Sequence, residues 1–140
     1  MSAARILVVE DNPSDIFLLK RVLNPYLDEI ELEIAADGEL AIEVVERLRD
    51  HDGEPAPCVI LLDLHLPKYE GLEVLHFIRR EPKLTHVHVV VTTSVASPRQ
   101  EKELLSLGAQ FRPKPSSMAQ YAELAEDLIA ICKGLPSREG

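Results

Sequence analysis

Acidic residues end two short apolar runs of this 140-residue chain. Glu10 and Asp11 follow residues 6–9 (ILVV), and Asp63 follows residues 58–62 (CVILL). Runs of this length are typical of central strands, so each acid is expected at the carboxyl end of a strand. If the two strands are parallel neighbours, three carboxylates converge, and they repel one another unless a divalent cation or a proton neutralises them. The pattern therefore predicts an acidic, cation-binding site.

Two further residues are expected at the same edge. Thr92 begins the run 92–94 (TTS) at the end of another apolar segment, and Lys114 follows a short fifth segment. Acids, a hydroxyl and a lysine together suit phosphoryl transfer, because a metal ion and a cationic side chain offset the negative charge of its transition state. Asp63 is the expected nucleophile, since carboxylates form acyl phosphates. Taken singly, the same residues would fit a solvated strand end, an ordinary strand threonine and a surface lysine.

The elements that position these residues alternate along the chain, which indicates an α/β fold with a parallel sheet. We predict a doubly wound, flavodoxin-like, five-stranded parallel sheet of order 2-1-3-4-5 with five helices. In such a sheet ligands bind where the winding reverses, between the first and third strands. The strands are predicted at residues 5–10, 31–35, 58–62, 87–92 and 110–112. The first helix is predicted to begin at Pro13. The other four are predicted to cover about residues 37–50, 71–80, 97–108 and 117–133.

Local signals define several of these elements. Residues 31–34 (ELEI) alternate in polarity, so the second strand is expected at an edge of the sheet. Asn12 is expected to cap the first helix, with Pro13 at its first position and Asp15 in its first turn. The last helix carries a broad apolar stripe that is expected to dock on the sheet. The stripe consists of Met118, Tyr121, Leu124, Ala125, Leu128, Ile129 and Cys132.

Composition limits the class of protein. The formal net charge is −9 and the basic residues are dispersed, which argues against a nucleic-acid-binding face. No apolar stretch approaches the roughly 20 residues that span a bilayer, and the amino terminus leads directly into a strand, so we expect a cytoplasmic protein that does not enter membranes. Cys58 and Cys132 lack metal-ligand spacing, and we expect two separate core residues without a disulfide. The polar loop 51–57 has no predicted role.

Four motifs, in their order and spacing, resemble the receiver domain of two-component response regulators along nearly the whole chain. They are residues 10–12 (EDN), 62–67 (LDLHLP) with Gly71 after them, 91–93 (VTT) and 114–115 (KP). The resemblance implies a receiver domain over residues 1–134 and a flexible tail over 135–140.

The resemblance also implies chemistry. Asp63 would accept a phosphoryl group from the phosphohistidine of a sensor histidine kinase. Mg²⁺, or Mn²⁺ in its place, would bind Asp11, Asp63 and the backbone carbonyl of His65. Glu10 would act on the metal ion through a coordinated water. The protein would be a phosphoacceptor that catalyses only its own phosphorylation and dephosphorylation.

A conformational switch is the implied output. Lys114 would pair with the phosphoryl oxygens, Thr92 would move to hydrogen-bond one of them, and Phe111 lies at the position of the family's switch aromatic. The segment 108–114 is one residue shorter than usual, so an irregular fifth strand is expected. The resemblance also predicts a cis peptide bond between Lys114 and Pro115.

Within the family, residues 10–15 (EDNPSD), residues 91–94 (VTTS) and the loop before the third strand resemble the stand-alone regulators paired with bacterial phytochromes. The expected partners are a phytochrome kinase and an unidentified downstream protein. A homodimer through the last helix region is a further expectation, since an apolar edge there would suit a symmetric contact, although the same residues would equally fit the core. These residues are Tyr121, Leu128, Ile131 and Leu135.

Two other functions remain open from the sequence. A phosphatase of the haloacid-dehalogenase type also uses an aspartyl nucleophile, but it needs a second Asp two residues later, where this chain has His65. A binding module that has lost phosphorylation would act as a constitutive adaptor.

Overall fold

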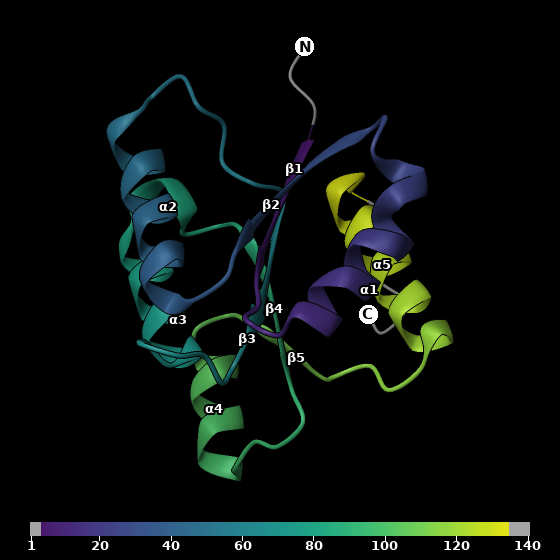
Figure 1. The fold of residues 1–140 in the computed structure, drawn as a ribbon. Helices are drawn as coiled ribbons and strands as arrows, with labels where there is room; N and C mark the ends of the chain where they lie inside the picture. The colour runs from purple at the N-terminus through teal and green to yellow at the C-terminus, as the bar shows by residue number, and fades with distance from the viewer. Residues whose placement is uncertain (1–3, 135–140) are drawn as a thin grey trace.

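Five parallel strands form one sheet in the computed structural model, which describes residues 4–134 (Figure 1). The strands are β1 (Ala4–Val9), β2 (Ile30–Ala35), β3 (Val59–Asp63), β4 (His88–Thr93) and β5 (Gln110–Pro113). The helices are α1 (Pro13–Leu23), α2 (Gly38–Asp50), α3 (Gly71–Arg80), α4 (Pro98–Ser106) and α5 (Met118–Cys132), with 3₁₀ turns at Asn24–Tyr26 and Pro82–Leu84. The order β2-β1-β3-β4-β5 confirms the predicted fold. The predicted tail, residues 135–140, lies outside the described residues.

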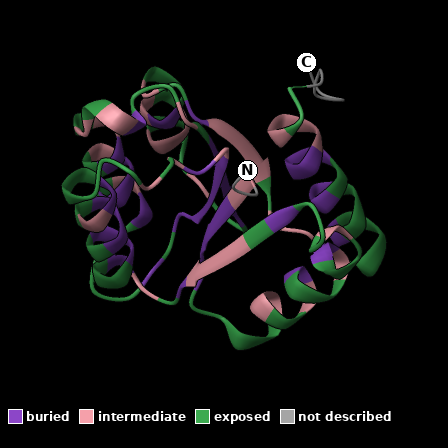
Figure 2. Ribbon diagram, turned by 90° about the horizontal axis from the view of Figure 1, so that it is seen from above, coloured by how far each residue is buried: buried purple, intermediate pink, exposed green. Residues whose placement is uncertain are grey.

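The two faces of the sheet are covered by different helices: α1 and α5 on one side, and α2, α3 and α4 on the other (Figure 1). Alternate residues of β1 enter the two cores. Ile6 and Val8 belong to the cluster that includes α1 and α5, whereas Leu7 and Val9 belong to the opposite cluster. Figure 2 shows the buried central strands between helices whose outer faces are exposed. This two-sided burial explains why the inner strands are continuous apolar runs.

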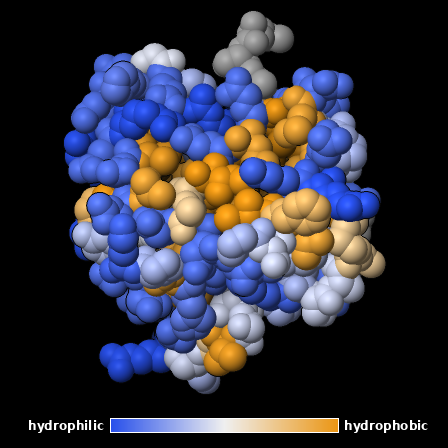
Figure 3. Space-filling model, viewed as in Figure 1, coloured by the Kyte–Doolittle hydropathy of each residue, from blue (hydrophilic) through white to orange (hydrophobic). Residues whose placement is uncertain are grey.

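β2 lies at the edge of the sheet, as its alternating sequence predicts. Its Glu31 is exposed, while Ile30 and Ala35 at its two ends are buried. Charged side chains on an edge strand hinder pairing of that strand with another chain. Figure 3, seen from the same side as Figure 1, shows apolar surface gathered between the two layers of helices near the middle of this face.

Side-chain caps begin the helices where the sequence predicts them. Asn12 Oδ1 accepts hydrogen bonds from the backbone N–H groups of Ser14 at 2.8 Å and Asp15 at 3.3 Å. Ser97 caps α4 in the same way. After α4 the chain turns at Gly108, whose φ of +73° lies in the left-handed region that glycine adopts without strain.

The loop 51–57, to which the sequence assigned no role, is fastened to the rest of the domain. Glu54 accepts hydrogen bonds from Arg47 Nη2 at 2.8 Å and from Arg5 of β1. The Lys83 ammonium group donates to backbone carbonyls of the same loop, including those of His51 and Glu54. The loop thereby ties β1, α2 and the turn after α3 together.

β5 is more regular than its short sequence suggested. Its residues pair with β4 in one continuous parallel register that ends with Thr93 opposite Pro113. The backbone N–H of Lys114 then donates to the Thr93 carbonyl at 3.1 Å. The prediction of a cis bond before Pro115 was wrong, because no peptide bond among the described residues is cis.

The two cysteines form a disulfide, so the prediction of two separate residues was wrong. Cys58 and Cys132 are 74 residues apart in sequence, with Cα atoms 5.1 Å apart. Cys58 immediately precedes β3, and Cys132 is the last residue of α5. Docking of α5 on the sheet brings the two cysteines together. Whether two cysteines can form a disulfide depends on their distance in the folded protein, and their spacing along the chain does not reveal that distance.

The apolar stripe of α5 docks on the sheet from Tyr121 onward, whereas Met118 is 45% exposed. Tyr121 and Leu128 are 5% and 0% exposed, so both belong to the core rather than to a dimer surface. Ile131 is half-buried, and Leu135 lies outside the described residues. Neither α5 nor any other described helix is long and apolar enough to cross a membrane.

Candidate functional site

Three carboxylates meet at the carboxyl edge of the sheet, as predicted. β1 pairs with β3, with Val9 opposite Leu62, so Glu10, which follows β1, lies beside Asp63, the last residue of β3. Oxygen atoms of Glu10, Asp11 and Asp63 all lie within 4.8 Å of one another. Glu10 and Asp63 are each 4% exposed, and Asp11 is exposed. Hard divalent cations prefer oxygen ligands of this kind, so the donor set fits such an ion.

The side chain of Asp63 is held from two directions. One carboxylate oxygen accepts a hydrogen bond from the backbone N–H of His65 at 3.1 Å, and the other lies 3.1 Å from Lys114 Nζ. Behind it, Gly71 approaches so closely that a Cβ atom there would lie 2.3 Å from the Asp63 carbonyl oxygen. Only glycine, which has no Cβ, fits at position 71 without displacing the backbone of Asp63.

Lys114 is the cation of this edge. Its Nζ lies 3.1 Å from Glu10, 2.9 Å from Asp15 and 3.1 Å from Asp63. Burial alone would lower the pKa of Lys114, but hydrogen bonds to Asp15 and Asp63 and the charge of Glu10 outweigh it and raise the pKa. The lysine is therefore charged at neutral pH.

One lysine does not neutralise these acids. Burial raises the pKa of Glu10 to about 7, and the charge of Asp63 adds to the increase, while the backbone N–H of Asn12 and the ammonium of Lys114 oppose it. The ammonium of Lys114 therefore does not outweigh the combined effect of burial and the neighbouring Asp63 charge on Glu10. A divalent cation would relieve this repulsion.

The two predicted switch residues, Thr92 and Phe111, lie in different surroundings. Thr92 is buried on β4, directly opposite Asp63 in the strand register. Phe111 of β5 is half-buried and packs against the core between the sheet and the helices α2, α3 and α4. The side chain of His65 turns to the β4–α4 loop, where its Nε2 lies 3.1 Å from the Val95 carbonyl oxygen.

Two site residues were missed as site residues by the sequence analysis. Asp15 was interpreted only as a favourable charge in the first turn of α1, and Tyr121 only as part of an apolar stripe and of a candidate dimer edge. The structure joins them, because the Tyr121 hydroxyl donates to Asp15 at 2.6 Å. Asp15 lies in the first turn of α1, the helix that directly follows Glu10 and Asp11, and this nearness to the acidic edge was the available signal.

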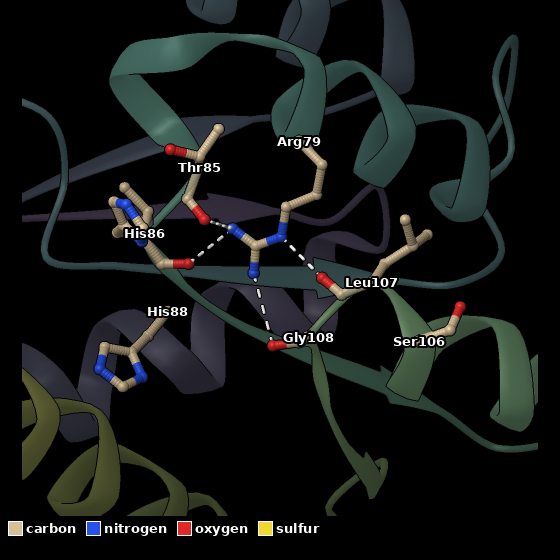
Figure 4. Close-up of a pocket in the computed structure, with 8 residues that line it drawn as sticks. Arg79, Thr85, His86, His88, Ser106, Leu107 and Gly108 are labelled. Atoms are coloured by element: carbon tan, nitrogen blue, oxygen red, sulfur yellow. Dashed lines mark hydrogen bonds between the residues drawn. The ribbon is translucent and has the colours of Figure 1, made fainter.

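The opposite edge of the sheet holds a cavity of about 550 Å³, which is lined by Arg79, His86 and His88 among other residues (Figure 4). Arg79 projects into it, but its guanidinium donates to backbone carbonyls, among them those of Leu107 at 2.7 Å and Val87 at 2.9 Å. Figure 4 shows these bonds converging on the one side chain. Arg79 thus satisfies the carbonyls at the end of α4.

The fold and the acidic edge define a class of protein. Residues 6–126 match the family model of the response regulator receiver domain, so the chain belongs to this family of signalling domains.

Two similar proteins, one of them compared by both sequence and structure, refine this assignment. The chain is 40% identical to the response regulator Rcp1 of Synechocystis over 89 residues, which are 64% of this chain and 60% of Rcp1. The phosphorylated cyanobacterial phytochrome response regulator RcpA has a similar structure, with a TM-score of 0.82, 26% identity, and coverage of 94% of this chain and 95% of that one. The Mn²⁺-bound form of Rcp1 gives a TM-score of 0.78, 30% identity, and coverage of 91% and 92%.

These similarities make the chain a homologue of phytochrome-associated response regulators. The alignment with the Rcp1 sequence spans about three fifths of that protein's length.

Proposed function

We propose that the protein is a stand-alone response regulator whose Asp63 accepts a phosphoryl group from a histidine kinase. The observation that carries the proposal is the buried Asp63 carboxylate, held 3.1 Å from Lys114 and within 4.8 Å of Glu10 and Asp11. The structural similarity to the phytochrome response regulator RcpA, with a TM-score of 0.82, supports the same kind of role.

The residues divide the chemistry among them. An Asp63 carboxylate oxygen forms a bond to phosphorus as the phosphorus–nitrogen bond to the kinase histidine breaks. Lys114 stabilises the charge on the phosphoryl oxygens, and Thr92, opposite Asp63, donates its hydroxyl to one of them. Asp11 and Asp63, with the His65 carbonyl, would hold Mg²⁺ and Glu10 would bind one of its waters. When bound, the cation offsets the negative charge of the transition state. Mn²⁺ is expected to substitute for it, in keeping with the Mn²⁺-bound form of Rcp1.

Acetyl phosphate with Mg²⁺ tests this assignment. We expect intact-protein mass spectrometry to show one added phosphoryl group on the wild-type chain and none on Asp63→Asn. Asp28→Asn is the matched control, because Asp28 is exposed just before β2 begins, at the opposite edge of the sheet. Equal labelling of Asp63→Asn and the wild-type chain would remove Asp63 from the role.

The response to Mg²⁺ distinguishes the proposed response regulator from an adaptor that has lost phosphorylation. A cation that binds only the folded state stabilises it by about 1.4 kcal/mol when its concentration exceeds the dissociation constant about tenfold. We expect thermal denaturation to show a higher Tm in millimolar Mg²⁺ for the wild-type chain, and a reduced shift for Asp11→Asn. No shift in the wild-type chain would favour the adaptor.

For its partners, we propose a phytochrome-type kinase upstream and a protein downstream that recognises the phosphorylated state. Similarity to RcpA supports the first. Purified candidate kinases with ATP labelled in the γ-phosphate would identify it by transfer of label to Asp63. We further propose that the protein works in the cytoplasm, where cellular reductants would act on the Cys58–Cys132 bond.

A homodimer through the last helix region is a separate proposal, supported by an exposed apolar side chain rather than by the residues first considered. Met118 at the start of α5 is 45% exposed. Light scattering of the wild-type chain and of Met118→Lys, with and without acetyl phosphate, tests it. A wild-type chain that stays monomeric in both states would refute the dimer.

A further inference from the structure

The ammonium group of Lys114 lies within ion-pair distance of three acids of the described chain. An ammonium group has three N–H donors, and three carboxylates from three elements surround it. Glu10 follows β1, Asp15 lies in α1 and Asp63 ends β3, with separations from Nζ of 3.1, 2.9 and 3.1 Å. The position of the lysine is therefore set jointly by these three acids.

Asp15 differs from the other two acids because it also contacts α5. Its Oδ2 accepts from Lys114 and its Oδ1 accepts from the Tyr121 hydroxyl at 2.6 Å. Tyr121 is 5% exposed and lies in the first turn of α5. One carboxylate thus joins the lysine of the site to the helix that follows it.

The protonation states suit this arrangement. Burial alone would raise the pKa of Asp15, but hydrogen bonds from Tyr121 and Lys114 outweigh it and lower the pKa. Burial and the bond to Asp15 raise the pKa of Tyr121. At neutral pH a charged carboxylate therefore accepts from a neutral hydroxyl and from an ammonium group, and such bonds to charged groups are the strong ones.

We propose that Asp15 is a positioning residue that holds Lys114 for phosphoryl transfer, and that its bond to Tyr121 transmits the state of Asp63 to α5. The inference rests on the proposed function. A phosphoryl group on Asp63 adds acceptor oxygens beside Lys114, and they compete with Asp15 for the same three donors. As Lys114 turns toward the phosphoryl group, Asp15 loses one of its two partners, and the environment of the Tyr121 hydroxyl changes with it.

The positioning role is tested by a double-mutant cycle. With acetyl phosphate and Mg²⁺, we expect Asp15→Asn to slow the phosphorylation of Asp63 by about tenfold, the size of one charge-assisted hydrogen bond. In a Lys114→Gln background the same substitution should have little further effect, because Asp15 acts through the lysine. Additive effects, or a wild-type rate in Asp15→Asn, would overturn the positioning role. Thermal melts check that each variant is folded.

The transmission to α5 is tested at the tyrosine itself. The chain has three tyrosines and no tryptophan, so fluorotyrosine labelling gives three ¹⁹F resonances, which Tyr121→Phe and Tyr26→Phe assign. On phosphorylation we expect the Tyr121 resonance to shift in the wild-type chain, and to shift much less in phosphorylated Asp15→Asn. The Tyr26 resonance is the internal control and should stay unchanged.

The outcomes separate the two proposals. A wild-type chain that mass spectrometry shows to be phosphorylated, but whose Tyr121 resonance does not move, would overturn the transmission and leave the proposed function intact. The same shift in Asp15→Asn as in the wild-type chain would remove Asp15 from the route. A wild-type chain that takes up no phosphoryl group would overturn both proposals.

Discussion

Gly71 shows how closely the backbone packs behind the phosphoacceptor. Its N–H donates to the Leu64 carbonyl at 2.8 Å, and an added Cβ would lie 2.3 Å from the Asp63 carbonyl oxygen and 2.7 Å from the Leu64 Cα. All three atoms involved belong to the main chain or to Cβ, so no flexible side chain can yield. The start of α3 therefore fixes the backbone that carries Asp63.

At this scale we predict that Gly71→Ala lowers the free energy of unfolding by about 1 to 3 kcal/mol, the usual cost of forcing extra atoms into a packed site. It should also slow phosphorylation, because the displaced backbone moves the Asp63 side chain away from Lys114. Urea denaturation and the acetyl phosphate assay measure the two effects. Gly53→Ala is the matched control, since a Cβ there meets nothing within 4 Å, and equal losses in both variants would contradict the packing argument.

At the scale of elements, the sequence predicts what depends on neighbours along the chain. Apolar runs located all five strands, and the predicted helix 71–80 coincides with α3. The Asn12 cap and the convergence of Glu10, Asp11 and Asp63 followed from local signals and from the sheet order. The contacts that sequence analysis missed join elements far apart in the chain, as Tyr121 and Asp15 do, and side-chain reach across a packed interface leaves no periodic pattern.

The fastening of the loop 51–57 is another contact of this kind, and it should depend on pH. Hydrogen bonds from Arg47 and Arg5 lower the pKa of Glu54 from 4.5 to about 2. A carboxylate with a lowered pKa in the folded state stabilises the protein above its unfolded pKa, and this contribution is lost as the pH falls through the folded value. The loss therefore falls between about pH 4.5 and about pH 2.

We predict that Glu54→Gln lowers the Tm at pH 7, and that its difference from the wild-type chain shrinks as the pH falls through this range. Thermal melts at a series of pH values measure it. Glu43→Gln, at an exposed position of α2, is the control for removing one charge. A constant difference between Glu54→Gln and the wild-type chain from pH 7 to pH 3 would show that the loop does not depend on the ionised carboxylate.

At the scale of the whole molecule, the disulfide closes most of the second half of the domain. It links residues 74 positions apart, so the chain-entropy model gives a stabilisation of about 4 kcal/mol, with about 2 to 4 typical of measured bonds. The bond joins the start of β3 to the end of α5, which lie at the edge of the sheet opposite the acidic cluster.

We accordingly predict that a phosphine reductant lowers the Tm of the wild-type chain while leaving the acidic site able to accept phosphate. The Cys58→Ala, Cys132→Ala double variant should melt at the same temperature with or without reductant. Differential scanning calorimetry and thiol titration measure the effect. Two titratable thiols in the unreduced, folded protein would contradict the bond.

The position of this bond also decides how α5 can respond to the site. Tyr121 lies in the first turn of the helix and Cys132 is its last residue, so about 16 Å of helix separates them. Because the disulfide holds the last residue of α5 against the start of β3, the first turn of the helix is the end that is free to move. A change at Asp15 would therefore displace the surface around Met118 most. Without the disulfide, the whole helix could shift, and the displacement at Met118 would be smaller.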